Sequence, residues 1–243
     1  MIPAISIAIP TYEMSGMGDQ YLTELFDTIN SQTLRDFEVC ISDHSLGDSI
    51  LKVCEKYANF FTIQYYKNYS NIGNGSANTN SVVEMCSGMI TKIMFQDDLF
   101  ISDNALHVIN STFKKFSCNW CFNGFTHTNN GIDQYRPMIP QWTDMMLEGR
   151  NLLGSPSTIS FNTNKFVKFD EKLVLLMDTD FYHRMRQKNG DPYIISQYLI
   201  SNREHNNRVS ALVKYDKIME HPDGNWMVNQ AELNYILSKH YET

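Results

Sequence analysis

The chain has 243 residues, a length that suits one α/β domain or a compact domain with a C-terminal extension. Apolar residues make up 42% of it, which is enough to build a sizeable core. The net charge is −7, and because phosphate backbones select basic surfaces, this balance argues against nucleic acid as a partner. A nucleotide ligand stays open, since a metal ion can mask the charge of a diphosphate from nearby carboxylates.

No apolar run approaches the roughly 20 residues that span a bilayer. The N-terminal segment MIPAISIAIPTYE has no basic region and no cleavage-type site, so we interpret it as a buried strand and not a signal peptide. An odd count of five cysteines without a secretory signal indicates reduced thiols. We therefore expect a cytoplasmic protein without a transmembrane segment, whose oligomeric state the sequence does not indicate.

The first half alternates short apolar strands with amphipathic helices. Strands are predicted at 5–9, 37–41, 63–66 and 89–95, and helices at 21–31, 50–60 and 73–86. This order implies a parallel sheet with right-handed crossovers, in which ligands bind beyond the carboxyl ends of the strands. Polar clusters follow three of these ends, at 11–13, 43–45 and 97–98.

The second half is less regular. We predict a helix at 104–116, an aromatic-rich strand at 119–126, an irregular region at 129–150 and a strand at 158–161. A helix at 175–188, a strand at 194–200 and a final helix at 226–240 follow. Because no linker or repeat divides the chain, we predict one domain over 1–243. Residues 1–100 would form its nucleotide-binding half, 101–215 its acceptor and catalytic half, and 216–243 a C-terminal helical extension.

The segment FQDDLF, at 95–100, places two carboxylates directly after a buried strand. Adjacent aspartates repel each other, so a fold that gathers them in a pocket usually supplies a cation. Mn²⁺ or Mg²⁺ suits such a site, because it takes one or two carboxylates together with substrate phosphates. The competing interpretation is a solvated loop that caps the following helix.

Six short segments follow one another along the chain: IAIPTYE, DFEVCISDHS, NIGNGSAN, FQDDL, LLMDTDFYHRM and SNREHNNRVS. Together they resemble a family-2 inverting glycosyltransferase with the GT-A fold, over roughly residues 3 to 212. The resemblance implies an α/β fold with a mainly parallel, Rossmann-like sheet flanked by helices and a mixed acceptor-binding half. It also implies a metal-dependent hexosyltransferase that moves a sugar from a nucleotide-sugar donor to a glycan or another hydroxyl acceptor.

The resemblance assigns the donor site residue by residue. Uracil or another pyrimidine is the favoured base, which points to a UDP-sugar, and guanine stays open. Asp43 matches the aspartate that bonds the pyrimidine edge. The remaining matches line the base and ribose, and they are Pro10, Thr11, Tyr12, Glu13, Asn71, Gly73 and Asn78.

By the same match Asp97 approaches the ribose and Asp98 binds the divalent ion. Many members carry a further aspartate where this chain has Phe95 or Gln96, which leaves open the side chain that contacts the ribose. His205 matches a third metal ligand, although a surface histidine is the competing interpretation.

Asp178 matches the catalytic base, because an acceptor hydroxyl is a poor nucleophile until a carboxylate takes its proton. The rival base is Asp180, and the glutamate usual before the base is Met177 here. Arg203 or Arg208 would neutralise the diphosphate.

One loop and two tryptophans of the predicted acceptor half can each be interpreted in two ways. The GSP loop at 154–156 matches a loop that borders the acceptor, and an ordinary turn is the competing interpretation. Trp120 and Trp142 are more readily core residues than acceptor platforms.

Two other functions fit the sequence less well. A sugar-phosphate nucleotidyltransferase would carry a basic glycine-rich loop after the first strand, where this chain has PTYEMSGMGD without lysine or arginine. A catalytically silent nucleotide-sugar or glycan-binding module has no need of a base such as Asp178.

Overall fold

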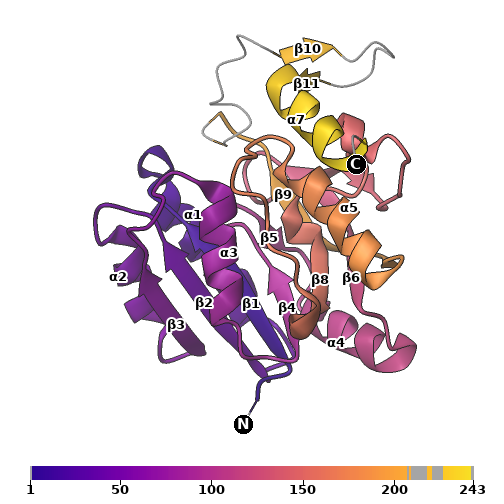
Figure 1. Ribbon diagram of the computed structural model, residues 1–243. Helices are drawn as coiled ribbons and strands as arrows, with labels where there is room; N and C mark the ends of the chain where they lie inside the picture. The colour runs from indigo at the N-terminus through magenta and orange to yellow at the C-terminus, as the bar shows by residue number, and fades with distance from the viewer. Residues whose placement is uncertain (1, 207, 209–217, 221–226, 242–243) are drawn as a thin grey trace.

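The computed structural model describes residues 2–206, 208, 218–220 and 227–241. Four parallel strands in the order β3-β2-β1-β4 build its N-terminal part (Figure 1). Their bounds are β1 (Ile5–Thr11), β2 (Phe37–Asp43), β3 (Thr62–Lys67) and β4 (Ile90–Ile93). The helices between them are α1 (Gly18–Asn30), α2 (Ser49–Tyr57) and α3 (Gly75–Met85).

The two faces of this sheet bury different helices. Ile5, Ile7 and Ile9 of β1 pack with α1 and α2, whereas Ala8 faces the valines of α3. Alternate residues of a strand point to opposite faces, which explains the division. Right-handed crossovers explain it as well, because the chain passes from β3 back across β2 and β1 to reach β4.

The sheet continues through the second half as β4-β8-β6-β9-β5, with β7 paired to β6. Only β6 and β9 pair in parallel in this part, and the other pairs are antiparallel. Its strands are β5 (Leu99–Phe100), β6 (Trp120–Thr128), β7 (Tyr135–Met138), β8 (Ile159–Asn162) and β9 (Tyr193–Arg203). Its helices are α4 (Ala105–Phe116) and α5 (Met177–Asn189). The predicted α/β class, with a parallel half and a mixed half, is confirmed.

Four strands of the structure are not predicted by the sequence pattern. β5 has two residues and lies inside FQDDLF, and β7 interrupts the region predicted to be irregular. A hairpin of β10 (Ile218–Glu220) and β11 (Met227–Asn229) precedes α7 (Gln230–Tyr241). The final helix was predicted to start at Trp226, which lies outside the described residues, as does the predicted boundary between 215 and 216. The helix begins at Gln230 because the residues before it pair across the hairpin.

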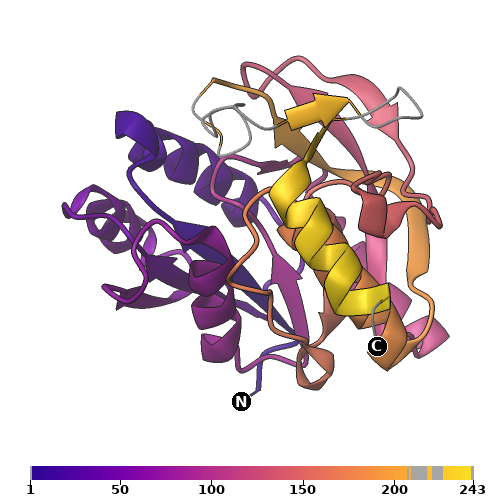
Figure 2. The same cartoon turned by 45° about the horizontal axis from the view of Figure 1, so that its top comes forward.

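Helix α7 lies against α5 and the short 3₁₀ helix η2 (Met146–Glu148), as Figure 2 shows. A small apolar cluster joins them, formed by Leu147, Leu173, Leu176, Leu233 and Ile236. Among the described residues, no helix is long and apolar enough to cross a membrane. Trp120 is fully buried, which confirms its interpretation as a core residue.

Candidate active site

A cleft of about 460 Å³ opens beyond the carboxyl ends of β1 and β4 and reaches the start of α5. Both halves of the chain line it. The loop at 154–156 contributes all three of its residues, so the GSP segment borders this cleft. Of the residues predicted for the site, those lining it are Pro10, Tyr12, Gly73, Asn78, Asp97, Asp98, Asp178, Arg203 and Arg208.

The end of β1 is held by Gln96, which lies three residues after the end of β4. Its Oε1 accepts from the Tyr12 N–H at 2.7 Å, and its Nε2 donates to the Tyr12 carbonyl at 3.0 Å. Helix α1 starts against the same carbonyl at Gly18, where a Cβ would lie 2.3 Å from the Tyr12 oxygen. Only glycine permits this approach, so the cleft floor depends on a residue without a side chain.

Asp98 is almost fully buried at 4% exposure. Its Oδ1 accepts from the Arg203 N–H at 2.9 Å, and its Oδ2 accepts from Asn202 Nδ2 at 2.9 Å and Ser155 Oγ at 3.3 Å. Burial, together with the charge of Asp97, raises the pKa of Asp98 to about 7. The carboxylate therefore joins the end of β9 to the 154–156 loop.

Asp97 is the more open of the two adjacent aspartates. Its Oδ2 lies 2.9 Å from His205 Nε2, and its backbone carbonyl accepts from Arg203 Nε. The guanidinium of Arg203 is also paired with Glu24 and lies over the Tyr21 ring at 4.6 Å. His205 reaches the edge of the cleft through Asp97 without lining it.

The side chains of Asp97, Asp98 and His205 suit a small divalent ion that takes few of its ligands from the protein. No group of three or more His, Cys, Asp or Glu side chains suited to a metal occurs in the described part of the chain. Two ligands at the ~2.0–2.1 Å typical of Mg²⁺ lie roughly 3 Å apart when adjacent in an octahedron. Asp97 Oδ2 and His205 Nε2 are hydrogen-bonded to each other at 2.9 Å, so an ion would have to replace this hydrogen bond, whereas at Asp98 it would have to displace the hydrogen bonds from Asn202 and the Arg203 backbone.

Asp178 enters the cleft from the first turn of α5. Its Oδ2 accepts from Asn151 Nδ2 at 2.7 Å, and its Oδ1 accepts from the Thr179 N–H at 2.8 Å. Burial raises its pKa to about 6, while these two hydrogen bonds favour the charged form and the charge of Glu232 opposes it. A carboxylate with this pKa is mostly ionised at neutral pH and still basic enough to accept a proton.

Asp180 points away from the cleft and is fully buried. Its oxygens accept from Arg184 Nε at 2.7 Å, Lys239 Nζ at 2.9 Å and His240 Nε2 at 2.9 Å. Burial on its own would raise the pKa of Asp180, but the hydrogen bonds from Arg184 and His240 hold it below its usual value. This carboxylate links α5 to the C-terminal helix.

Four residues that were predicted to bind the nucleotide-sugar do not line the cleft. Thr11 is fully buried beside Asp43, and Glu13 accepts from the N–H groups of Leu46 and Gly47. Asn71 donates to Glu171 at 3.3 Å.

Asp43 is the fourth. It is fully buried, and its oxygens accept from Ser45, Tyr65 and Lys67. Burial opposes its ionisation, but the hydrogen bonds outweigh that effect and hold the pKa of Asp43 below its usual value. The carboxylate is therefore charged and fully engaged inside the protein.

Arg208 stands at the mouth of the cleft with 44% of its side chain exposed and a 3.8 Å contact to Glu204. Sequence reasoning missed Asn151, Asn202 and Glu232, which contact the two key aspartates or the backbone beside them. Asn202 belongs to the recognised segment SNREHNNRVS, but Asn151 and Glu232 belong to no motif and could not be singled out from the sequence.

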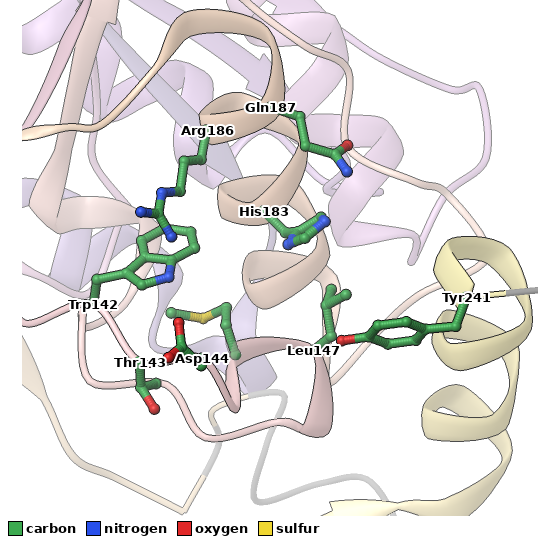
Figure 3. Close-up of a pocket in the computed structure, with 9 residues that line it drawn as sticks. Trp142, Thr143, Asp144, Leu147, His183, Arg186, Gln187 and Tyr241 are labelled. Atoms are coloured by element: carbon green, nitrogen blue, oxygen red, sulfur yellow. The ribbon is translucent and has the colours of Figure 1, made fainter.

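A second pocket of about 320 Å³ lies between η2, α5 and the end of α7 (Figure 3). The guanidinium of Arg186 lies over the Trp142 ring at 4.4 Å, Tyr241 lies on the opposite side of the pocket, and His183 lies between them. Trp142 therefore belongs to this pocket and does not line the main cleft.

The sequence is similar to known glycosyltransferases. The chondroitin synthase of Escherichia coli is 28% identical over 195 residues, which are 76% of this chain and 27% of that protein. The chain thus spans about a quarter of the length of that relative. An uncharacterised glycosyltransferase of Methanocaldococcus jannaschii is 24% identical over 215 residues, which are 83% of this chain and 71% of that protein.

Solved structures share the fold. Residues 1–349 of TarS from S. aureus superpose with a TM-score of 0.67 at 18% identity, covering 98% of this chain and 70% of that one. The same protein in complex with UDP gives 0.66. The mannosyltransferase PcManGT from Pyrobaculum calidifontis, in complex with GDP-Man and Mn²⁺, gives 0.62 at 13% identity, covering 89% of this chain and 59% of that one.

The model of the family described as Glycosyl transferase family 2 matches residues 6–174, well over half of the sequence. The matched region runs from β1 to the loop before α5 and includes both aspartates of FQDDLF. The chain belongs to glycosyltransferase family 2 and has the GT-A fold.

Proposed function

We propose that this chain transfers a sugar from a nucleotide-diphosphate donor, by preference a UDP-sugar, to a hydroxyl of a glycan or similar acceptor, with inversion at the anomeric carbon. One observation carries the proposal. Asp97 and Asp98, from the end of β4, line the same cleft as Asp178, from the first turn of α5. A sugar donor bound at Asp97 and Asp98 would therefore lie next to an acceptor hydroxyl activated by Asp178.

The nucleotide is assigned to the end of the cleft formed by β1 and α3. Pro10, Tyr12 and Gly73 line it together with Asn78. The Oδ1 of Asn78 is buried and accepts no hydrogen bond within the described structure, although its Nδ2 donates to the Thr11 carbonyl. A buried acceptor without a donor is costly, and an N–H of the ligand would satisfy it.

Asp43 stays a predicted contact of the base. Its engagement with Ser45, Tyr65 and Lys67 means that contact with a pyrimidine edge requires one internal partner to be exchanged. The solved complexes of TarS contain UDP and UDP-GlcNAc, which supports the choice of a uridine donor for this chain.

We assign a divalent ion, Mn²⁺ or Mg²⁺, to Asp97 and His205. When bound, such an ion neutralises charge that develops on the departing diphosphate. Asp98, the ligand predicted from the sequence, then holds Asn202 and the backbone of Arg203 in place behind it. The Mn²⁺ in the complex of PcManGT with GDP-Man supports the use of a divalent ion by a protein of this fold.

Arg203 contacts the backbone carbonyl of Asp97 and the carboxylate of Glu24, so it supports the loop from behind. Arg208 has the more exposed guanidinium and stands at the cleft mouth, where it suits a diphosphate oxygen.

Asp178 takes the role of general base. Asn151 orients one carboxylate oxygen, and the acceptor hydroxyl gives its proton to the carboxylate as its oxygen attacks the anomeric carbon. The bond to the diphosphate breaks in the same displacement, which inverts the configuration. Asp180 is less suited to this role, because its oxygens accept hydrogen bonds from Arg184, Lys239 and His240 outside the cleft.

The proposal is tested with a panel of UDP- and GDP-sugars, by measuring release of nucleotide diphosphate with Mn²⁺ and after chelation. We expect metal-dependent release from a uridine donor, accelerated by a productive acceptor. In Asp178→Asn, donor affinity should stay within about twofold while transfer falls by roughly 10²–10⁴-fold. The matched control is Asp144→Asn, an exposed carboxylate of the second pocket, which should transfer normally.

Two outcomes would contradict it. Donor binding without release or transfer across a broad acceptor panel would indicate a silent binding module. Normal transfer by Asp178→Asn would remove the proposed base.

A further inference from the structure

Glu232, in the first turn of α7, places its carboxylate against the backbone that leads into α5. Oε1 accepts from the Val174 N–H at 3.1 Å, and Oε2 accepts from the Leu175 and Leu176 N–H groups at 3.0 and 2.8 Å. These donors lie just before the first residue of the helix, Met177, where N–H groups have no partner within the helix. A carboxylate at this position also interacts favourably with the helix dipole.

The backbone that Glu232 holds is a wall of the cleft. Leu173, Val174, Leu175 and Met177 all line it, and Asp178 follows directly. Three backbone N–H groups that donate to one carboxylate therefore fix the segment that carries the proposed base. A displacement of about 1 Å at such a segment can lower a rate by roughly 10²-fold, because the reacting atoms lose their alignment.

The rest of α7 is fastened to the same region independently. Lys239 pairs with Asp170 at 2.6 Å and with Asp180 at 2.9 Å. Leu233 and Ile236 pack into the apolar cluster under α5. Because these contacts hold the helix without Glu232, they do not explain why a carboxylate faces the 174–176 backbone.

We propose that Glu232 is a positioning residue for glycosyl transfer. Through Glu232, helix α7 fixes residues 174–176 in the wall of the cleft beside Asp178. The inference rests on the proposed function of Asp178 as base. The family match ends at residue 174 and does not reach α7. The C-terminal helix thus becomes part of the catalytic architecture of this chain.

The first test does not need turnover. Amide hydrogen exchange is measured in the full chain with Glu232→Ala, Glu232→Gln and Lys239→Ala, the last of which weakens the far end of the same helix. We expect faster exchange at 174–178 in Glu232→Ala and a smaller effect in Glu232→Gln, which keeps one carbonyl acceptor. Lys239→Ala should leave exchange at 174–178 near the wild-type rate. Unchanged exchange in Glu232→Ala would overturn the proposal.

The second test separates positioning from stability. With a UDP-sugar and a productive acceptor, assayed well below each Tm, Glu232→Ala should lower kcat at least about tenfold and leave donor KM within about twofold. Lys239→Ala should lose Tm without a comparable loss of kcat. A loss of kcat that follows Tm equally in both variants would reduce Glu232 to a structural residue. Failure of the proposed function itself would show separately, as absence of transfer by the wild-type chain.

Discussion

The Nδ2 of Asn151 lies 2.7 Å from Oδ2 of Asp178, and this contact ties the loop before the GSP segment to the first turn of α5. The hydrogen bond favours the ionised carboxylate, whereas burial favours the protonated one. Their balance leaves Asp178 with a pKa of about 6, and several measurable consequences depend on it.

Transfer should be lost as pH falls through about 6. The protonated Asp178 carboxyl accepts no proton, so kcat should drop about tenfold for each pH unit below its pKa. Asn151→Ala removes a donor that stabilises the charged form, which should move the acidic limb to higher pH. The kcat–pH profiles of the two proteins check this, and an acidic limb that stays in place would argue against Asp178 as the titrating group.

Asp178→Asn should be inactive without being unstable. Folding raises the pKa of Asp178 above its unfolded value, so the unfolded state binds fewer protons and the ionised carboxylate lowers the free energy of unfolding near pH 7. The neutral amide of the substituted asparagine removes this destabilisation, and its oxygen still accepts a hydrogen bond from Asn151 or Thr179. We expect a Tm at pH 7 equal to or above that of the wild type, measured by calorimetry. A clear drop in Tm would show that the charge stabilises the fold.

Asp180→Asn should behave in the opposite way. Its folded pKa is held below the unfolded value, so its charge stabilises the fold above the unfolded pKa, and that stability is lost as pH falls through the folded pKa. The substitution leaves Arg184 and Lys239 without their shared carboxylate. We expect a loss of roughly 3 kcal/mol in urea unfolding at pH 7. Full stability combined with lost transfer would instead return Asp180 to the role of base.

Metal affinity should distinguish the adjacent aspartates. Asp97→Asn and His205→Ala each remove a proposed ligand, so Mn²⁺-dependent donor binding should weaken by more than about tenfold. Asp98→Asn should lower Tm more than Mn²⁺ affinity, because Asp98 binds Asn202 and the Arg203 backbone. Calorimetric titration of UDP with and without Mn²⁺ measures the affinities, and a calorimetric thermal scan measures Tm. Loss of metal dependence in Asp98→Asn alone would place the ion on Asp98, as predicted from the sequence.

Asn78→Ala should weaken nucleotide binding by roughly three- to tenfold, the worth of one neutral hydrogen bond. Asn110, on α4, also has a buried Oδ1 without a partner in the described structure and lies outside the cleft lining, so Asn110→Ala is the matched control. Titration with UDP measures both variants. Equal affinities in Asn78→Ala and the wild type would exclude Asn78 Oδ1 as a contact of the base.

The sequence by itself determined the alternation of strands and helices up to β4, because each element buries one apolar face with its own period. It also identified Asp97, Asp98 and Asp178 as candidate site residues, since each belongs to a short motif that can be recognised from neighbouring residues. The parallel sheet then followed from the general handedness of crossovers. These inferences needed only neighbouring residues and general rules.

The tertiary structure decided the surroundings of each aspartate within those motifs. Asp178 and Asp180 are two residues apart, yet one opens into the cleft and the other pairs with Lys239 and His240 of α7. Asp97 and Asp98 divide in the same way between His205 and Asn202. The partners come from distant parts of the chain, and the pKa of a carboxylate depends on the solvent, charges and donors that folding brings around it.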